Sequence, residues 1–215
     1  MNFIKILLVI CINFIFQFTL NAQDLKFNAE FKKGLIILDS ATTTEDFLKA
    51  IKKFENSLTT DKKNWLTYYY LGISNSVIAF HKKGKEVDDY CDKAEKYCNK
   101  ADSLQKNNSE IYVLKSMIEA ARIAVNPIKR GQKYSSLSAK YNVQALKFNP
   151  NNPRAHLQKA RAILNTPVAI GGGPKKAKPL YEAAIEKYKT FKPEHEFFPN
   201  WGLKEAKLKL KKINQ

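Results

Sequence analysis

Helix-breaking residues are scarce in this sequence, and its long apolar runs are confined to the N-terminus. Eight glycines and eight prolines are spread over 215 residues. No segment alternates apolar and polar residues with the period of two that is typical of a half-buried strand. Beyond the first 20 residues, no run approaches the ~20 apolar residues that a membrane span needs. The sequence therefore predicts an all-α chain with no membrane-spanning segment in its body.

The N-terminal segment has the pattern of a secretory signal. It reads MNFIKILLVICINFIFQFTLNAQ, in which Lys5 precedes two apolar blocks and the small residue Ala22 follows them. Cleavage after Ala22 is favoured over retention as a membrane anchor, because polar residues interrupt the apolar stretch. We therefore predict a signal peptide over residues 1–22 and a helical domain over residues 23–215, exported to a periplasm or secreted.

Acidic residues are also few. There are 20 Asp and Glu against 37 Lys and Arg, which gives a formal net charge of +17. Nucleic acid is the usual partner of a cytosolic chain with such a charge, but export makes an anionic lipid, a polysaccharide or an acidic protein more accessible. A lysine-rich surface that only keeps the protein in solution is the alternative.

Three cysteines are present, and one of them, Cys11, lies in the predicted signal. Cys91 and Cys98 are seven residues apart, which on one helix separates their Cα atoms by about 10.5 Å. A disulfide needs a separation below about 7 Å. We predict that the two do not pair with each other and are small buried residues, with an intermolecular bridge through Cys91 as the alternative. Neither has metal-ligand neighbours at a suitable spacing.

A short phrase recurs along the chain: a small residue, a bulky residue four positions later and a second small residue three positions after that. It occurs as Ala50, Phe54, Ser57; as Ala94, Cys98, Ala101; as Ser138, Asn142, Ala145; and as Ala177, Tyr181, Ala184. Small residues let two helices approach closely, and the bulky residue fills the adjoining groove. After the first three phrases the pattern predicts new helices, which begin at Trp65, Ser109 and Pro153.

Two segments resemble the tetratricopeptide repeat (TPR) family. ALKFNPNNPRAHLQKARAIL supplies Ala145 and the proline-asparagine turn that starts at Pro150. NWLTYYYLGISNSV supplies the aromatic, leucine and glycine of a first helix, at Tyr68, Leu71 and Gly72. The resemblance implies an α-solenoid of stacked antiparallel helix pairs in which neighbouring pairs bury each other's faces.

The resemblance extends from about Asp24 to the C-terminus, with a capping helix expected near residues 200–213. The family repeat is roughly 34 residues long, whereas the phrases here recur at intervals of 44, 44 and 39 residues. The excess falls between the two helices of each pair, in residues 80–89, 125–134 and 165–176. Long turns along one edge of the array follow from this.

Local signals predict helix starts and one tight turn. Thr42 with Glu45 fits a capping box, and Asn152 before Pro153 fits an N-cap followed by proline at the first helical position. The run GGGPKKAK at residues 171–178 could be a phosphate cradle or a turn. Because no strand precedes it and no Ser or Thr follows its lysines, the turn is favoured.

The TPR resemblance also implies a binding surface, since first helices of successive pairs line a concave groove in that family. The inward positions carried over by register are Leu66, Tyr69, Ile73, Val77, Glu110, Val113, Met117, Ala120, Arg154, Leu157, Arg161 and Asn165. This row is apolar and aromatic at one end and basic at the other, which suits a peptide with an apolar segment and an acidic end. A terminal helix packed over the same residues is the alternative.

The sequence thus predicts a non-catalytic TPR-like scaffold that binds a protein or peptide partner in the cell envelope. Electrostatic binding of an anionic lipid or polymer is the alternative, and a small-ligand-binding component of an envelope transport system is a third possibility. No nucleophile elbow or HExxH pattern is present. We expect no enzyme activity, cofactor, metal or nucleic-acid partner. The partner's identity and the oligomeric state stay open.

Overall fold

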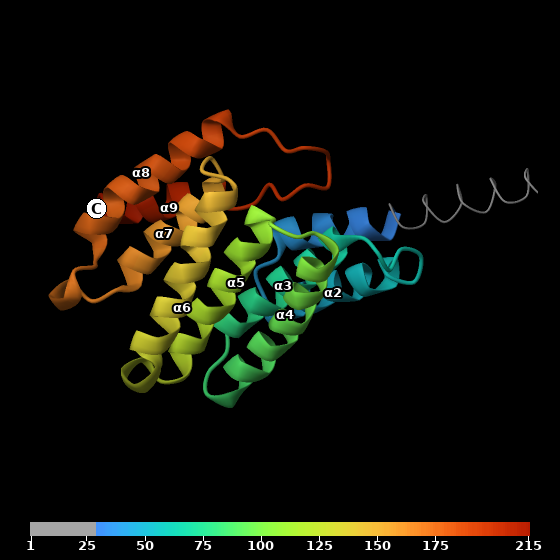
Figure 1. Cartoon of the computed structure of the whole chain (residues 1–215), viewed down its shortest axis with the longest axis horizontal. Coiled ribbons are helices and arrows are strands. Elements are labelled where there is room, and N and C mark those ends of the chain that lie inside the picture. Colours follow the sequence, from blue (N-terminus) through green and yellow to red (C-terminus); the bar gives the residue numbers. More distant parts are fainter. Residues whose placement is uncertain (1–28) are drawn as a thin grey trace, which may run out of the picture.

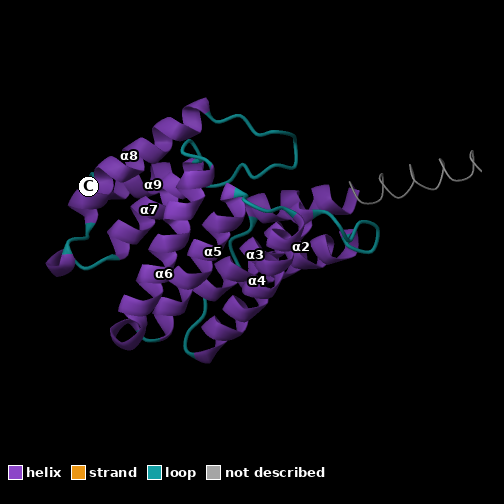
Figure 2. Cartoon of the chain, in the orientation of Figure 1, coloured by secondary structure: helices purple, strands orange, loops and turns teal. Residues whose placement is uncertain are grey.

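The computed structural model describes residues 29–215, so the predicted signal peptide lies outside the described residues. Within this part of the chain only helices and connecting turns occur, and no strand is formed (Figure 2). The all-α prediction is confirmed.

A helical stretch over residues 29–40 precedes the labelled helices. These are α2 (Thr44–Ser57), α3 (Trp65–Phe80), α4 (Lys85–Leu104), α5 (Ser109–Arg122), α6 (Pro127–Phe148), α7 (Pro153–Asn165), α8 (Pro174–Thr190) and α9 (Leu203–Ile213). Single 3-10 turns, η1 (Ile123–Val125) and η2 (Val168–Ile170), precede α6 and α8. Helices α3, α5 and α7 begin at the three residues that the repeat predicts.

The helices stack as antiparallel pairs in chain order (Figure 1). Helix α3 packs along α4, α5 along α6, and α7 along α8, while α9 packs on α8 at the end of the array. The first helices of the pairs, α3, α5 and α7, also contact one another in sequence. The predicted TPR-like solenoid with a C-terminal capping helix is therefore the observed architecture.

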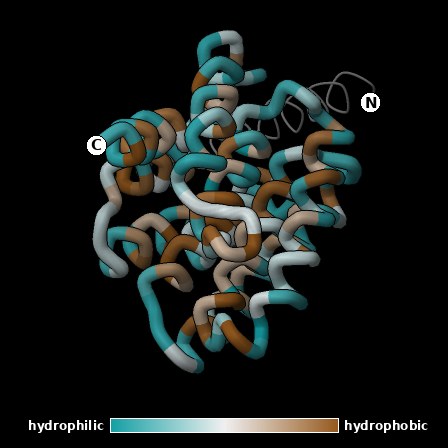
Figure 3. Tube along the Cα trace, turned by 90° about the vertical axis from the view of Figure 1, so that its left-hand side faces the viewer, coloured by the Kyte–Doolittle hydropathy of each residue, from teal (hydrophilic) through white to brown (hydrophobic). Residues whose placement is uncertain are grey.

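The recurring phrase makes the contacts between these helices. Its alanines are fully buried, and the bulky positions Phe54, Cys98 and Tyr181 are buried with them. Asn142, in a slot that usually holds an aromatic residue, is 7% exposed, and its Oδ1 has no hydrogen-bond partner among the described residues. Figure 3 shows the result as hydrophobic and hydrophilic bands that alternate along the helices.

Asparagine N-caps define the starts of the first helices. The side chains of Asn64, Asn108 and Asn152 each accept a hydrogen bond from a backbone N–H in the first turn of the helix that follows. The capping box before α2 is one residue later than predicted. It pairs Thr43 with Asp46, because α2 starts at Thr44 and this register satisfies both the Thr43 and Asp46 backbone N–H groups.

Cys91 and Cys98 are free thiols, both buried against α5. Their sulfurs lie 3.7 Å from the carbonyl oxygen of Ile118 and 3.8 Å from that of Ile111. Burial raises the pKa of both thiols to about 12. Their role is to fill space between helices.

The glycine run before α8 is a turn. Gly171 and Gly173 have φ values of 95° and 94°, in the left-handed region that favours glycine. Gly172 packs so closely on Thr166 that a Cβ at this position would overlap the Thr166 carbonyl. The backbone N–H of Gly173 donates to the carbonyl of Ile163 at 2.9 Å, which ties the turn to the end of α7.

Gly172→Ala therefore tests the turn directly. We expect a loss of about 1–3 kcal/mol in the free energy of unfolding, because the added methyl group meets backbone rather than a movable side chain. Gly131→Ala is the matched control: Gly131 lies in α6 with open space around its Cα, and alanine there should stabilise by roughly 0.5–1 kcal/mol. Urea unfolding of both variants measures this, and equal stability would refute the packing described.

Candidate functional site

A buried ion pair joins two first helices. Glu110, near the start of α5, accepts two hydrogen bonds from Arg154, near the start of α7, with Nε–Oε2 and Nη2–Oε1 distances of 2.7 Å each. Arg154 is fully buried and Glu110 is 2% exposed. A charge-assisted, bidentate pair of this kind fixes both distance and orientation.

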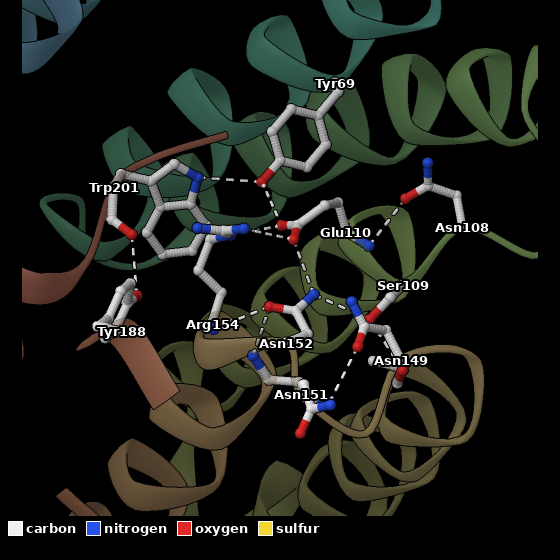
Figure 4. A network of polar contacts seen from close by, with 12 residues as sticks. Tyr69, Asn108, Ser109, Glu110, Asn149, Asn151, Asn152, Arg154, Tyr188 and Trp201 are labelled. Carbon is white, nitrogen blue, oxygen red and sulfur yellow. Dashed lines mark hydrogen bonds and ion pairs between the residues drawn. The ribbon is translucent and has the colours of Figure 1, made fainter. Parts of the chain in front are cut away.

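The pair is the centre of a larger polar network (Figure 4). Tyr69 of α3 donates to Glu110 Oε2 at 3.3 Å, and Asn152 donates to Glu110 Oε1 at 2.8 Å. The indole N–H of Trp201 donates to the Tyr69 hydroxyl at 3.0 Å. The network thus connects α3, α5 and α7 with the segment that leads into α9.

Burial and charge shape the ionisation of this network. Burial lowers the pKa of Arg154, but the charge and hydrogen bonds of Glu110 outweigh that effect and leave the pKa above its ordinary value. The pKa of Tyr69 is raised well above its usual value by burial and by the Glu110 carboxylate. The guanidinium therefore keeps its charge, and Tyr69 keeps the proton that it donates to Glu110.

Residues 191–202 run from α8 to α9 and pack on the first halves of α3 and α7. Phe191 lies under the Arg154 guanidinium at 4.4 Å from ring centroid to Cζ. Phe197 packs edge-on against Phe31 at 5.2 Å, and its carbonyl accepts a hydrogen bond from Tyr70 at 3.2 Å. Tyr188 donates to the carbonyl of Trp201 at 2.9 Å. The segment is thus held at both ends.

The second halves of α3 and α5 form the floor of a cleft of about 990 Å³. Ile73 and Val77 of α3 and Met117 of α5 line the floor. Residues 38–42 form one wall, and α9 with the residues just before it forms the other. Trp201, Leu203 and Leu208 belong to that second wall, so the lining is apolar and aromatic at its centre. We call this space the concave cleft.

The rim of the concave cleft is basic. Arg161 and four lysines of α9 line it, against two acidic residues, Asp39 and Glu205. Arg161 is bound by Glu205 through two hydrogen bonds. The lysines make no ion pair with another residue in the described part of the chain, so they are available to a ligand; they are Lys204, Lys207, Lys209 and Lys212.

The twelve groove positions expected from the sequence therefore divide into three sets. Those that line the cleft are Ile73, Val77, Met117 and Arg161, of which Ile73 and Met117 are only 4% and 3% exposed. Those that are buried are Leu66, Tyr69, Glu110, Val113, Arg154 and Leu157. Those that are at least partly exposed but do not line it are Ala120 and Asn165. Four of the twelve positions therefore line the cleft, and the groove as a binding surface stays a prediction.

Sequence reasoning missed the wall of the cleft. It predicted α9 only as a capping helix, whereas exposed lysines of α9, at 204, 207, 209 and 212, also line the cleft. The dense aromatic content of residues 191–201, in FKPEHEFFPNW, is the signal that could have indicated a segment that packs on other helices.

Among solved structures, two illustrate the similarity. The chain shares 32% sequence identity with the HusA haemophore from Porphyromonas gingivalis, with a TM-score of 0.77, over 87% of this chain and 92% of that one. It shares 15% identity with a thermophilic TPR protein of Thermus thermophilus, with a TM-score of 0.63, over 87% of this chain and 80% of that one. No protein-family model and no curated protein matches the sequence.

The fold defines a TPR-like helical-repeat protein with a ligand-sized cleft on its concave face. At 32% identity over almost the whole length of both chains, this protein belongs to the family of the HusA haemophore. Residues 29–215 contain no helix that is long and apolar enough to cross a membrane.

Arg154→Ala tests the buried network. Glu110 would be left as an unpaired buried charge, so the free energy of unfolding should fall by about 3–5 kcal/mol. Replacing Glu110 and Arg154 together by methionine should lower the free energy of unfolding by less than the sum of the losses in the two single variants. The double variant leaves no unpaired buried charge. Urea unfolding followed by tryptophan fluorescence measures both. Lys189→Ala, which breaks an exposed pair with Glu186, is the control and should change little. Additive losses would contradict this role of the pair.

Proposed function

We propose that this protein binds haem or a closely related porphyrin in the concave cleft. The observation that carries the proposal is a cleft of about 990 Å³ with an apolar floor and a lysine rim in a member of the HusA haemophore family. A porphyrin is a flat, largely apolar macrocycle with carboxylates at one edge. The apolar floor suits the macrocycle, and the lysine rim suits its carboxylates.

The floor would contact the macrocycle. Ile73, Val77 and Met117 present aliphatic and thioether groups from three turns of two packed helices, so the surface is fixed by the core beneath it. Trp201 and Leu208 face the same space from the opposite wall. Stacking on an aromatic side chain and burial of apolar area would supply most of the affinity.

The rim would hold the carboxylates. The four α9 lysines of the concave cleft are solvent-exposed and make no ion pair with the described residues, so their charge is not already neutralised. Arg161, by contrast, is occupied by Glu205, which keeps α7 and α9 together. The contribution of the lysines should weaken as salt is added, whereas the apolar contribution should persist.

The proposed activity is binding without a chemical step. It places the protein in the third class that the sequence left open, a carrier of a small ligand, and the export predicted from the N-terminus is compatible with it. A peptide held in the same cleft is the second candidate, because the floor lies on first helices of a TPR-like array. Displacement of bound haem by a peptide would favour that candidate.

Leu208→Asp tests the site without touching the core, since Leu208 is 52% exposed. We expect haem affinity to fall at least about tenfold, because the change removes apolar contact area and adds a charge that repels carboxylates. The readout is the Soret absorbance during titration with haem. Val143→Asp is the matched control, because Val143 is 67% exposed on α6 and does not line the cleft. Equal affinities for the two variants would exclude the cleft as the site.

A second prediction concerns the iron. Haem iron is usually held by His, Cys, Met or Tyr side chains, and of these types the cleft lining contains Met117 alone, which is 3% exposed. We therefore expect the macrocycle, not the metal, to carry the affinity. Iron-free protoporphyrin should bind within a few-fold of haem, and Met117→Leu should leave haem binding nearly unchanged. A large loss in both measurements would show that Met117 ligates the iron.

A further inference from the structure

The three turns that join the two helices of a pair lie along one margin of the array, at the lower left of Figure 1. The connections themselves are residues 81–84, 123–126 and 166–173, because much of the extra repeat length lies in longer helices. Together with the adjoining helix ends, the margin comprises residues 80–86, 125–134 and 165–178. We call this margin the long-turn edge. Because the pairs are antiparallel and stacked in order, these turns repeat at the same end of each pair.

Large apolar side chains project at all three connections, from the end of α3, the first turn of α6 and the 3-10 turn η2. Ile128 is 97% exposed, Val168 and Ile170 are each 74% exposed, and Phe80 is 48% exposed. They make up four of the eight exposed large hydrophobic side chains in the described part of the chain. Single exposed apolar residues are ordinary on protein surfaces, but their presence on every turn of one edge is a regular feature of this array.

The same turns and helix ends are strongly basic. They contain nine lysines and arginines against Glu86, with Asp88 and Asp89 following in α4. Lys82 is paired with Glu86, and Arg130 with Asp88. The remaining seven make no ion pair with any described residue; they are Lys83, Lys85, Lys129, Lys133, Lys175, Lys176 and Lys178. The long-turn edge thus combines protruding apolar tips with uncompensated positive charge.

The opposite edge differs in both respects. Its turns, residues 58–64, 105–108 and 149–152, end in asparagine caps. None of their residues is among the exposed large hydrophobic side chains. The contrast means that the apolar, basic character belongs to one edge and is not an average property of a basic protein.

We propose that the long-turn edge docks on an anionic lipid surface. Apolar side chains can enter the boundary between headgroups and acyl chains while lysines beside them contact anionic headgroups. A protein partner would need a continuous apolar patch of matching shape. Here the tips sit on separate turns with lysines between them, and this arrangement fits a fluid, planar, negatively charged surface better.

The geometry links this edge to the concave cleft. Val77 lies in the last turn of α3, and Met117 and Arg161 lie in the second halves of α5 and α7, which lead into the three long turns. Docking through the long-turn edge would therefore hold the cleft near the lipid. The proposal does not depend on haem binding, since its observations lie outside the cleft.

Vesicle co-sedimentation of the mature protein tests the proposal. We expect binding to vesicles of equal parts phosphatidylcholine and phosphatidylglycerol and little binding to pure phosphatidylcholine. Replacing Lys129, Lys133 and Lys175 by glutamine should lower the vesicle partition coefficient about 100-fold. Each lysine near an anionic surface contributes a similar share of the binding free energy, and three are removed. The matched control replaces Lys62, Lys63 and Lys147, which are exposed outside the long-turn edge. Its partition coefficient should fall much less.

The apolar part is tested separately. Ile128→Ser combined with Val168→Ser and Ile170→Ser should weaken binding roughly tenfold or more and remove the fraction that survives high salt. Leu48→Ser combined with Val143→Ser is the control, because both positions are exposed away from the edge. Haem titration of every variant should be unchanged, which separates a failure here from a failure of the cleft.

Three outcomes would overturn the proposal: no preference for the anionic vesicles, equal losses in the edge variants and their controls, or a loss in the lysine variant with none in the apolar variant. The last would mean that general electrostatic attraction, without insertion of the tips, accounts for the binding.

Discussion

The buried pair between Glu110 and Arg154 is the constraint on which the rest of the structure depends. It joins α5 to α7, and through Tyr69 and Trp201 it joins both to α3 and to the segment before α9. A buried pair gives little net stability compared with apolar residues of the same size. What it contributes is geometry, because the bidentate contact through Nε and Nη2 fixes the distance and orientation of α5 relative to α7.

With the helices in this arrangement, residues 191–202 fill one half of the concave face and the cleft occupies the other half. Residues 191–202 close over the first halves of the inner helices and bring α9 to the side of the second halves, where the cleft remains. A TPR-like groove that would suit an extended peptide over its whole length is thereby shortened to a compact, apolar, lysine-rimmed space. The same helices continue into the long turns, so the open half of the groove and the basic, apolar-tipped edge are neighbours.

The sequence was sufficient for the fold because its signals are local. The recurring phrase, with the Asn152 cap for α7, placed the starts of α3, α5 and α7 at the correct residues. It was insufficient for the site, because the cleft depends on contacts between residues far apart in the chain, such as Trp201 with Tyr69. No periodicity in residues 191–202 indicates where an irregular segment will lie. Inner-face register alone cannot distinguish Ile73, which lines the cleft, from Glu110, which lies in the buried network.

The most direct test of the central claim is to follow the methyl signals of the labelled protein by NMR while porphyrin is added. If the concave cleft is the site, the methyl groups of Ile73, Val77, Met117 and Leu208 should respond first and together, because they line one cleft. Responses confined to methyl groups elsewhere, for example Leu48 and Ile51 between α2 and α4, with these four unchanged, would contradict it.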